Sequence, residues 1–133
     1  MNIKLICDFN ENFDSKTDVG HINDHQTKDL FEKINQAINE LGFNCEIFGG
    51  TKELIQACND NLINQHDIYI NLSDGTDTPY SRVQIPVMCD MLHLKYSGGG
   101  TFETALTTNK YYSSIAKNSK IRYNKIYMSI GFY

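Results

Sequence analysis

The chain has 133 residues, of which 41% are hydrophobic and 21% are charged, and its formal net charge is -4. These values fit one globular domain. A weakly acidic chain whose only arginines are Arg82 and Arg122 is a poor match for a protein that binds nucleic-acid phosphates. No apolar run approaches the roughly 20 residues of a membrane span, and residues 1–9 lack the features of a signal peptide. The sequence therefore predicts a cytoplasmic protein without nucleic-acid or membrane partners.

The four cysteines are widely spaced and form no C-x-x-C pair: Cys7, Cys45, Cys58 and Cys89. This spacing predicts neither a zinc site nor a redox motif. Each cysteine lies in an apolar stretch, so we expect buried, reduced thiols.

Two apolar patterns alternate over the first 72 residues. Short β-prone runs predict strands at residues 3–9, 44–48 and 66–72. Apolar residues at three- and four-residue steps predict helices at 27–41 and 52–63, the first ending at Gly42 and the second capped by Thr51. The polar residues 10–25 are predicted to form a long loop of the kind that is often functional.

The alternation continues to the end of the chain. A capping box of Ser81 and Gln84 predicts a helix to about Leu92, in which Pro86 is expected to remove one backbone hydrogen bond. A short strand at 94–97 and three glycines follow, and Thr101 is predicted to cap a single helix through about Lys117. Alternating apolar residues at 126–132 predict a terminal strand.

Strands that alternate with helices predict an α/β fold with a mostly parallel, doubly wound sheet in three α/β/α layers. We expect residues 1–118 to form this domain and residues 119–133 to be a terminal strand or linker. In such folds ligands bind beyond the carboxyl ends of the strands. Here these ends are the loops 9–25, 49–51, 73–81 and 98–101.

Four sequence blocks between residues 66 and 117 carry a family resemblance. They are Asn71-Leu72-Ser73-Asp74-Gly75, Gln84-Ile85-Pro86-Val87, Lys95-Tyr96-Ser97-Gly98 and Ala105-Leu106-Thr107-Thr108-Asn109-Lys110. In this order and with these gaps, they resemble the N-terminal, Rossmann-like pre-ATP-grasp domain of the D-alanine–D-alanine ligases and their ATP-grasp relatives. Residues 1–65 match the family only in the order of strands and helices.

The resemblance implies an ATP-dependent carboxylate–amine ligase of peptidoglycan (cell-wall) biosynthesis. The N-terminal domain of such an enzyme helps to bind an amino-acid substrate, and two further domains hold ATP and Mg²⁺. An acyl phosphate forms and an amine attacks it, so catalysis depends on positioning and charge neutralisation. Because 133 residues leave no room for the ATP-grasp domains, we expect this chain to fold but to bind no cofactor and ligate no amino acids alone.

The resemblance also implies roles for individual residues. Lys110 matches a lysine that reaches toward the nucleotide phosphates, although a lysine on a helix surface is otherwise simply solvated. Asp74 and Gly75 match an acidic residue and a glycine that face the substrate, and the alternative is an ordinary Asp-Gly turn. Glu11 could replace a substrate-binding glutamate of the first loop. The departures from the family are Asn109 for Asp, Asp74 for Glu, Arg82 near a Glu position, and a first loop without Gly-Gly-x-Ser-x-Glu.

The remaining candidates depend on the residues alone. Gly98 and Gly99 precede a predicted helix and would offer amides to a nucleotide phosphate, unless they only form a flexible turn. No Gly-Lys-Ser/Thr follows them, so they form no P-loop. Polar residues of the first loop could bind a metal but are expected to be solvated: Asp18, His21, Asp24 and His25. Asp8 would suit a receiver domain, an interpretation that leaves the four blocks unexplained.

A second hypothesis is a non-enzymatic module with the same fold. It would hold a small anion or an amino acid at loops 73–81 and 98–101, or it would form a homodimer through the apolar edge strand 126–132. Calorimetry separates the two hypotheses. A ligase domain alone should bind ATP and amino acids weakly, whereas a dedicated module should bind one of them clearly.

Overall fold

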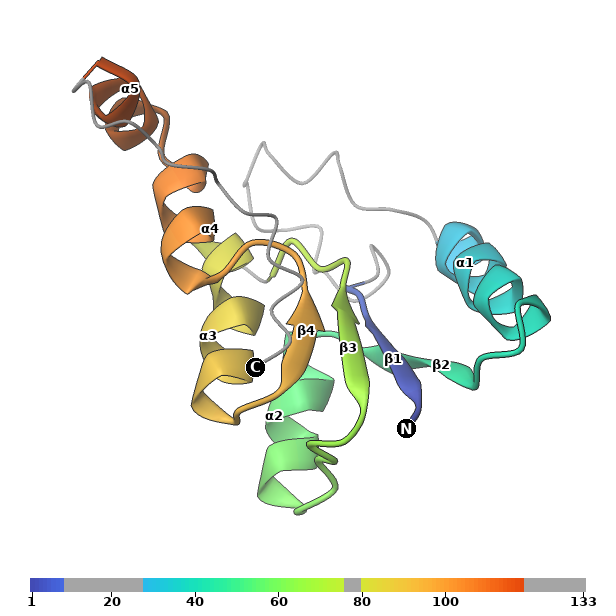
Figure 1. The fold of residues 1–133 in the computed structure, drawn as a ribbon. Helices are drawn as coiled ribbons and strands as arrows, with labels where there is room; N and C mark the ends of the chain where they lie inside the picture. The colour runs from blue at the N-terminus through green and yellow to red at the C-terminus, as the bar shows by residue number, and fades with distance from the viewer. Residues whose placement is uncertain (9–27, 76–79, 119–133) are drawn as a thin grey trace, which may run out of the picture.

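The computed structural model describes residues 1–8, 28–75 and 80–118, and within them four parallel strands form one sheet (Figure 1). The strands are β1 (Ile3–Ile6), β2 (Cys45–Gly49), β3 (Ile68–Asn71) and β4 (Lys95–Ser97). The helices are α1 (Lys28–Glu40), α2 (Thr51–Asn59), α3 (Gln84–Met91), α4 (Thr101–Thr108) and α5 (Lys110–Asn118). The α/β fold with a parallel sheet is therefore confirmed.

The strand order β2-β1-β3-β4 determines how the helices cover the sheet. From β1 the chain first moves outward to β2 and then returns past β1 to β3 (Figure 1). Right-handed crossovers in opposite directions place α1 on one face and α2 and α3 on the other. The strand order changes direction between β1 and β3, which makes this pair the topological switch point of the doubly wound fold. The carboxyl ends of β1 and β3 therefore flank the crevice at which such folds bind ligands.

The main apolar core lies between the sheet and helices α2 and α3. Ile6 of β1 and Tyr69 of β3 pack with buried residues of the two helices and with the residue directly before β4: Leu54, Ile85, Cys89 and Leu94. On α1, Phe31 is buried, and this helix packs against β2. Burial of such side chains contributes roughly 1.5–3 kcal/mol each.

Three predicted helix starts are wrong in detail. Gly50 and Gly100 occupy the N-cap positions of α2 and α4, so Thr51 and Thr101 are the first helical residues. The predicted capping box does not form, because Ser81–Val83 is a 3-10 turn and α3 begins at Gln84 without a side-chain cap. Pro86 is thus the third residue of α3, where a backbone N–H has no partner within a regular α-helix.

The predicted single helix over residues 101–117 is two helices. Asn109 separates α4 from α5 and has extended backbone angles, with φ -100° and ψ 109°. Both helices extend past the carboxyl ends of the strands, and α5 lies farthest from the sheet (Figure 1).

The long loop 10–25 and the terminal strand 126–132 lie outside the described residues, as do Glu11 and the proposed metal-binding residues of that loop. Within the described part of the chain, no helix has the length and apolar character needed to cross a membrane.

Candidate functional site

Three strand ends meet in a polar cluster at the carboxyl edge of the sheet. We define this switch-point cluster as Asp8 after β1, Gly50 and Thr51 after β2, and Ser73 to Gly75 after β3. Because β1 lies between β2 and β3, the segments that follow the three strands are neighbours. The position is the one at which doubly wound folds bind their ligands.

A register shift brings the end of β2 against Asp8. Ile6 pairs with Gly49 instead of Phe48, and the Cys7 N–H donates to the Gly49 carbonyl over 2.9 Å. Gly49 has a φ of +107°, a conformation that side chains disfavour. The extra residue turns Gly50 and the start of α2 toward the carboxylate that follows β1.

Asp8 connects all three strand ends through its carboxylate. The residue is only 8% exposed. Its Oδ1 accepts a hydrogen bond from the Thr51 backbone N–H at 3.2 Å, and its Oδ2 accepts one from the Ser73 hydroxyl. Bonds to an ionised acceptor are stronger than neutral ones. The carboxylate therefore joins β1, the first turn of α2 and the segment after β3.

Ser73 also fixes the glycine turn that follows it through hydrogen bonds. Its Oγ accepts the Gly75 backbone N–H at 2.8 Å, while its own N–H donates to the Asn71 side chain at 3.1 Å. On the other side of the cluster, the Thr51 hydroxyl lies 3.5 Å from Gln84 Oε1. The hydrogen bonds thus run from the end of β3 to the start of α3.

Two glycines of the cluster leave no space for a side chain. A Cβ at position 50 would overlap the Asp8 carboxylate, and a Cβ at position 75 would overlap the Ser81 carbonyl. Gly75 also has a φ of +75°. The backbone therefore approaches its neighbours closely at both positions.

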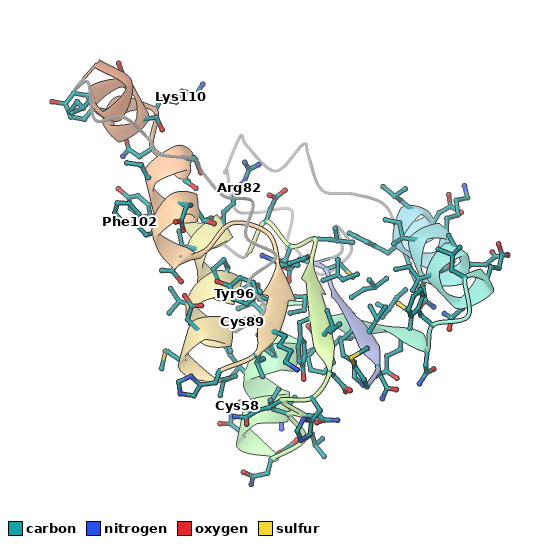
Figure 2. The ribbon with its side chains drawn as sticks, in the orientation of Figure 1. Cys58, Arg82, Cys89, Tyr96, Phe102 and Lys110 are labelled. Carbon is teal, nitrogen blue, oxygen red and sulfur yellow. The ribbon has the colours of Figure 1, made fainter. Side chains whose placement is uncertain are left out.

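Asp74 points from this turn to Arg82. Asp74 Oδ1 lies 2.9 Å from Arg82 Nε, and both side chains are substantially exposed. Arg82 lies at the carboxyl side of the sheet, on the 3-10 turn before α3 (Figure 2). An exposed pair contributes little to stability, so its main effect is to place a cation next to the Asp74 carboxylate at this edge of the cluster.

The local charge also affects the thiol next to Asp8. Burial raises the pKa of Cys7 to about 12, with further contributions from the Asp8 and Glu53 carboxylates. This thiol therefore stays protonated at neutral pH and is no nucleophile. All four cysteines are free, and all but the half-buried Cys58 are buried. The described residues contain no group of three or more side chains that could hold a metal ion.

The predicted anion site at Gly98 and Gly99 lies apart from this cluster, after β4. Both glycines are exposed. Thr104 Oγ1 donates to the Gly99 carbonyl at 3.0 Å, and a Cβ at Gly100 would lie 2.6 Å from the Glu103 carboxylate. A carboxylate of the chain itself thus lies at the N-terminus of α4, where it would oppose a bound anion.

The start of α4 is anchored to α3 and β4 by Asp90. Its two carboxylate oxygens accept the Tyr96 hydroxyl at 2.9 Å and the Thr101 hydroxyl at 2.5 Å. Burial and the hydrogen bond to Asp90 raise the pKa of Tyr96. Tyr96 and Cys89 lie together between α3 and the sheet (Figure 2).

Lys110 begins α5 on the projecting part of the chain and is exposed (Figure 2). Among the described residues, no hydrogen bond or ion pair links it to Asp74, Gly75 or the glycine run. The structure thus brings Asp74 and Gly75 together with Asp8, and it leaves Gly98, Gly99 and Lys110 on separate elements. Their proposed roles stay predictions.

Sequence reasoning missed Asp8, Thr51 and Gln84 as members of one cluster. The usable signal was an acidic residue directly after a buried strand, together with Gly-Gly after the next strand. The hydrogen-bond partners of Asp8 are 43 and 65 residues away in the chain, which no local pattern reveals.

Comparison with known proteins gave no match: no family model, no curated protein and no solved structure is significantly similar to the chain.

Proposed function

We propose that this chain supplies the substrate-side domain of an ATP-dependent carboxylate–amine ligase of the D-alanine–D-alanine ligase type. Two observations support the proposal. The four sequence blocks resemble that family, and the block Asn71–Gly75 lies at the carboxyl end of β3, beside the switch point at which such folds bind ligands.

The observation that carries the proposal is the ordering of the turn Ser73–Gly75 by the buried Asp8 carboxylate. A hydrogen-bonded turn of this kind presents its backbone in a fixed geometry, with the exposed Asp74 side chain paired to Arg82. Fixed geometry is what a substrate-positioning domain contributes, since a ligase gains rate by holding the amine and the activated carboxylate in place.

The roles of single residues follow from this assignment. Ser73, Asp74 and Gly75 would contact the amino-acid substrate, with Arg82 beside Asp74. Lys110 would reach toward the nucleotide phosphates. ATP, with Mg²⁺, supplies the phosphoryl group that activates the carboxylate, and the family resemblance assigns the metal ligands to segments outside these 133 residues.

The test uses the complete polypeptide that the gene encodes. We expect ADP formation that depends on an added amino acid, with D-alanine as the first probe. Asp74→Ala should raise the KM for the amino acid about tenfold or more, a loss of roughly 1.4 kcal/mol, while the KM for ATP changes less than about twofold. Asp60→Ala is the matched control, because Asp60 lies at the C-terminal end of α2, whereas the N-terminal end of α2 lies at the cluster.

Absence of amino-acid-dependent ADP formation for a panel of amino acids would overturn the proposal. Tight binding of one amino acid or anion to the polypeptide without ATP cleavage would instead support the stand-alone binding module. Reading the coding sequence beyond Tyr133 gives a further check, since a ligase requires lysine and Asp/Glu/Asn groups for ATP and Mg²⁺.

A further inference from the structure

A single residue interrupts the helical segment at the end of the described chain. Asn109 has extended backbone angles between α4 and α5. The interruption involves neither glycine nor proline, the usual causes of a sharp helix break. Beyond it, α5 projects away from the sheet (Figure 1).

Side-chain hydrogen bonds lie on both sides of this junction. The hydroxyls of Thr107 and Thr108 donate to the carbonyls of Glu103 and Thr104 at 2.8 and 2.7 Å, a pattern that bends helices. Asn109 Oδ1 accepts the Tyr111 backbone N–H at 3.0 Å, the hydrogen bond of an N-cap. α5 therefore has an N-cap of its own, as a separate helix requires.

Among the described elements, α5 packs beside α4 and leaves large side chains exposed. Its main contacts among the described elements are with α4. Across the break, the Ser113 hydroxyl donates to the Leu106 carbonyl at 2.7 Å. Tyr111 is 69% exposed and Ile115 is 46% exposed. By contrast, Asp90 holds the first residue of α4 to α3 and β4.

We propose that Asn109 is a hinge about which α5 moves as a rigid arm, and that the Ser113–Leu106 hydrogen bond is the strap that holds the bent arrangement. The competing arrangement is one continuous helix, in which regular backbone hydrogen bonds replace the Asn109 cap. Lys110 is the first residue of the arm, so the motion changes its direction. Only the consequence for nucleotide binding rests on the proposed function; the hinge itself does not.

Residual dipolar couplings and ¹⁵N relaxation of the ¹⁵N-labelled chain test the hinge without ATP or substrate. In the unmodified chain we expect the couplings of the α5 amides to fit an alignment tensor of smaller magnitude than those of the sheet and α4, because motion of α5 averages its couplings. Ser113→Ala removes the strap and should reduce the α5 tensor by a further factor of about two. Ser114→Ala, at an exposed neighbouring position of the same helix, is the matched control and should leave it unchanged.

Asn109→Ala gives the second test, because alanine lacks the cap and favours a helix interior. We expect α4 and α5 of this variant to fit one tensor with collinear axes. Equal tensors for α4 and α5 in both the unmodified chain and Ser113→Ala would show a rigid junction and overturn the hinge. A retained bend in Asn109→Ala would show that Asn109 does not set it.

Discussion

Asp8 and Gly50 are packed so closely that the carboxylate of one fills the space that a side chain of the other would need. Gly50 has a φ of -104°, so glycine is not needed here to supply a positive φ. The contact with Asp8 by itself excludes a side chain at this position. This pair is the centre of the switch-point cluster, because the same carboxylate binds the first turn of α2 and the turn after β3.

Gly50→Ala should lower the free energy of unfolding by about 2–3 kcal/mol, since the added methyl group must displace a buried carboxylate. Urea denaturation measures the change. Gly42→Ala is the control: Gly42 has a φ of +88° but nothing within 4 Å of its Cβ position, so only backbone strain remains, about 1 kcal/mol. Equal losses for the two variants would contradict the steric argument.

Asp8→Ala should lower stability by about 2–3 kcal/mol, because it leaves the Thr51 amide and the Ser73 hydroxyl without their acceptor. Ser73→Ala removes one of the same bonds. The loss for the double variant should therefore fall short of the sum of the two single losses by about 1 kcal/mol. Denaturation of all four proteins measures this coupling. Strict additivity would mean that the two residues act independently.

Stability should fall as the pH rises above about 9, because burial raises the pKa of Cys7 and of Cys89 to about 12 in the folded chain. An unfolded thiol ionises near pH 9, whereas the folded thiol stays protonated until about pH 12. Between these two pH values the thiol is ionised in the unfolded state but protonated in the folded state, so a rise in pH favours unfolding. Urea denaturation at pH 8 to 11 should show a shallower fall for Cys89→Ala than for the unmodified chain. Parallel curves would show that this thiol does not contribute.

Asn39 should protect the outer edge of the sheet at β2. Its Oδ1 accepts the Cys45 N–H at 3.1 Å and its Nδ2 donates to the Cys45 carbonyl at 3.0 Å, so it satisfies both groups as a neighbouring strand would. Asn39→Ala should cost about 1 kcal/mol and expose an edge that favours self-association. Sedimentation velocity at several concentrations measures the self-association. Gln36→Ala, on the exposed side of α1, is the control, and identical sedimentation of the two variants would refute the protective role.

Local patterns in the sequence were sufficient to predict the order of strands and helices from β1 to the start of α4. The apolar stripe of α1 and the short β-prone runs of β1 to β3 each depend on neighbouring residues, so periodicity detects them. The helix starts were displaced by one residue at α2 and α4, because a threonine next to a glycine was assumed to be the N-cap. Glycine is also accepted at that position.

The break at Asn109 and the role of Asp8 could not be predicted in this way. The segment around Asn109 contains no glycine or proline, and hydroxyl groups and one amide side chain end the helix instead. Asp8 acts through partners that only the parallel crossovers bring near. Of the candidate site, the turn Asp74–Gly75 was identified from sequence, whereas the carboxylate that orders it required the fold.

The close contact of Asp8 with Gly50 also links the divergence of these two positions. A larger residue at position 50 becomes tolerable only when position 8 has lost its carboxylate, and because each single change is destabilising, either order passes through a destabilised intermediate. Homologues with a side chain at position 50 should therefore carry a small residue at position 8. Such covariation would record, across lineages, a constraint that neither position reveals by itself.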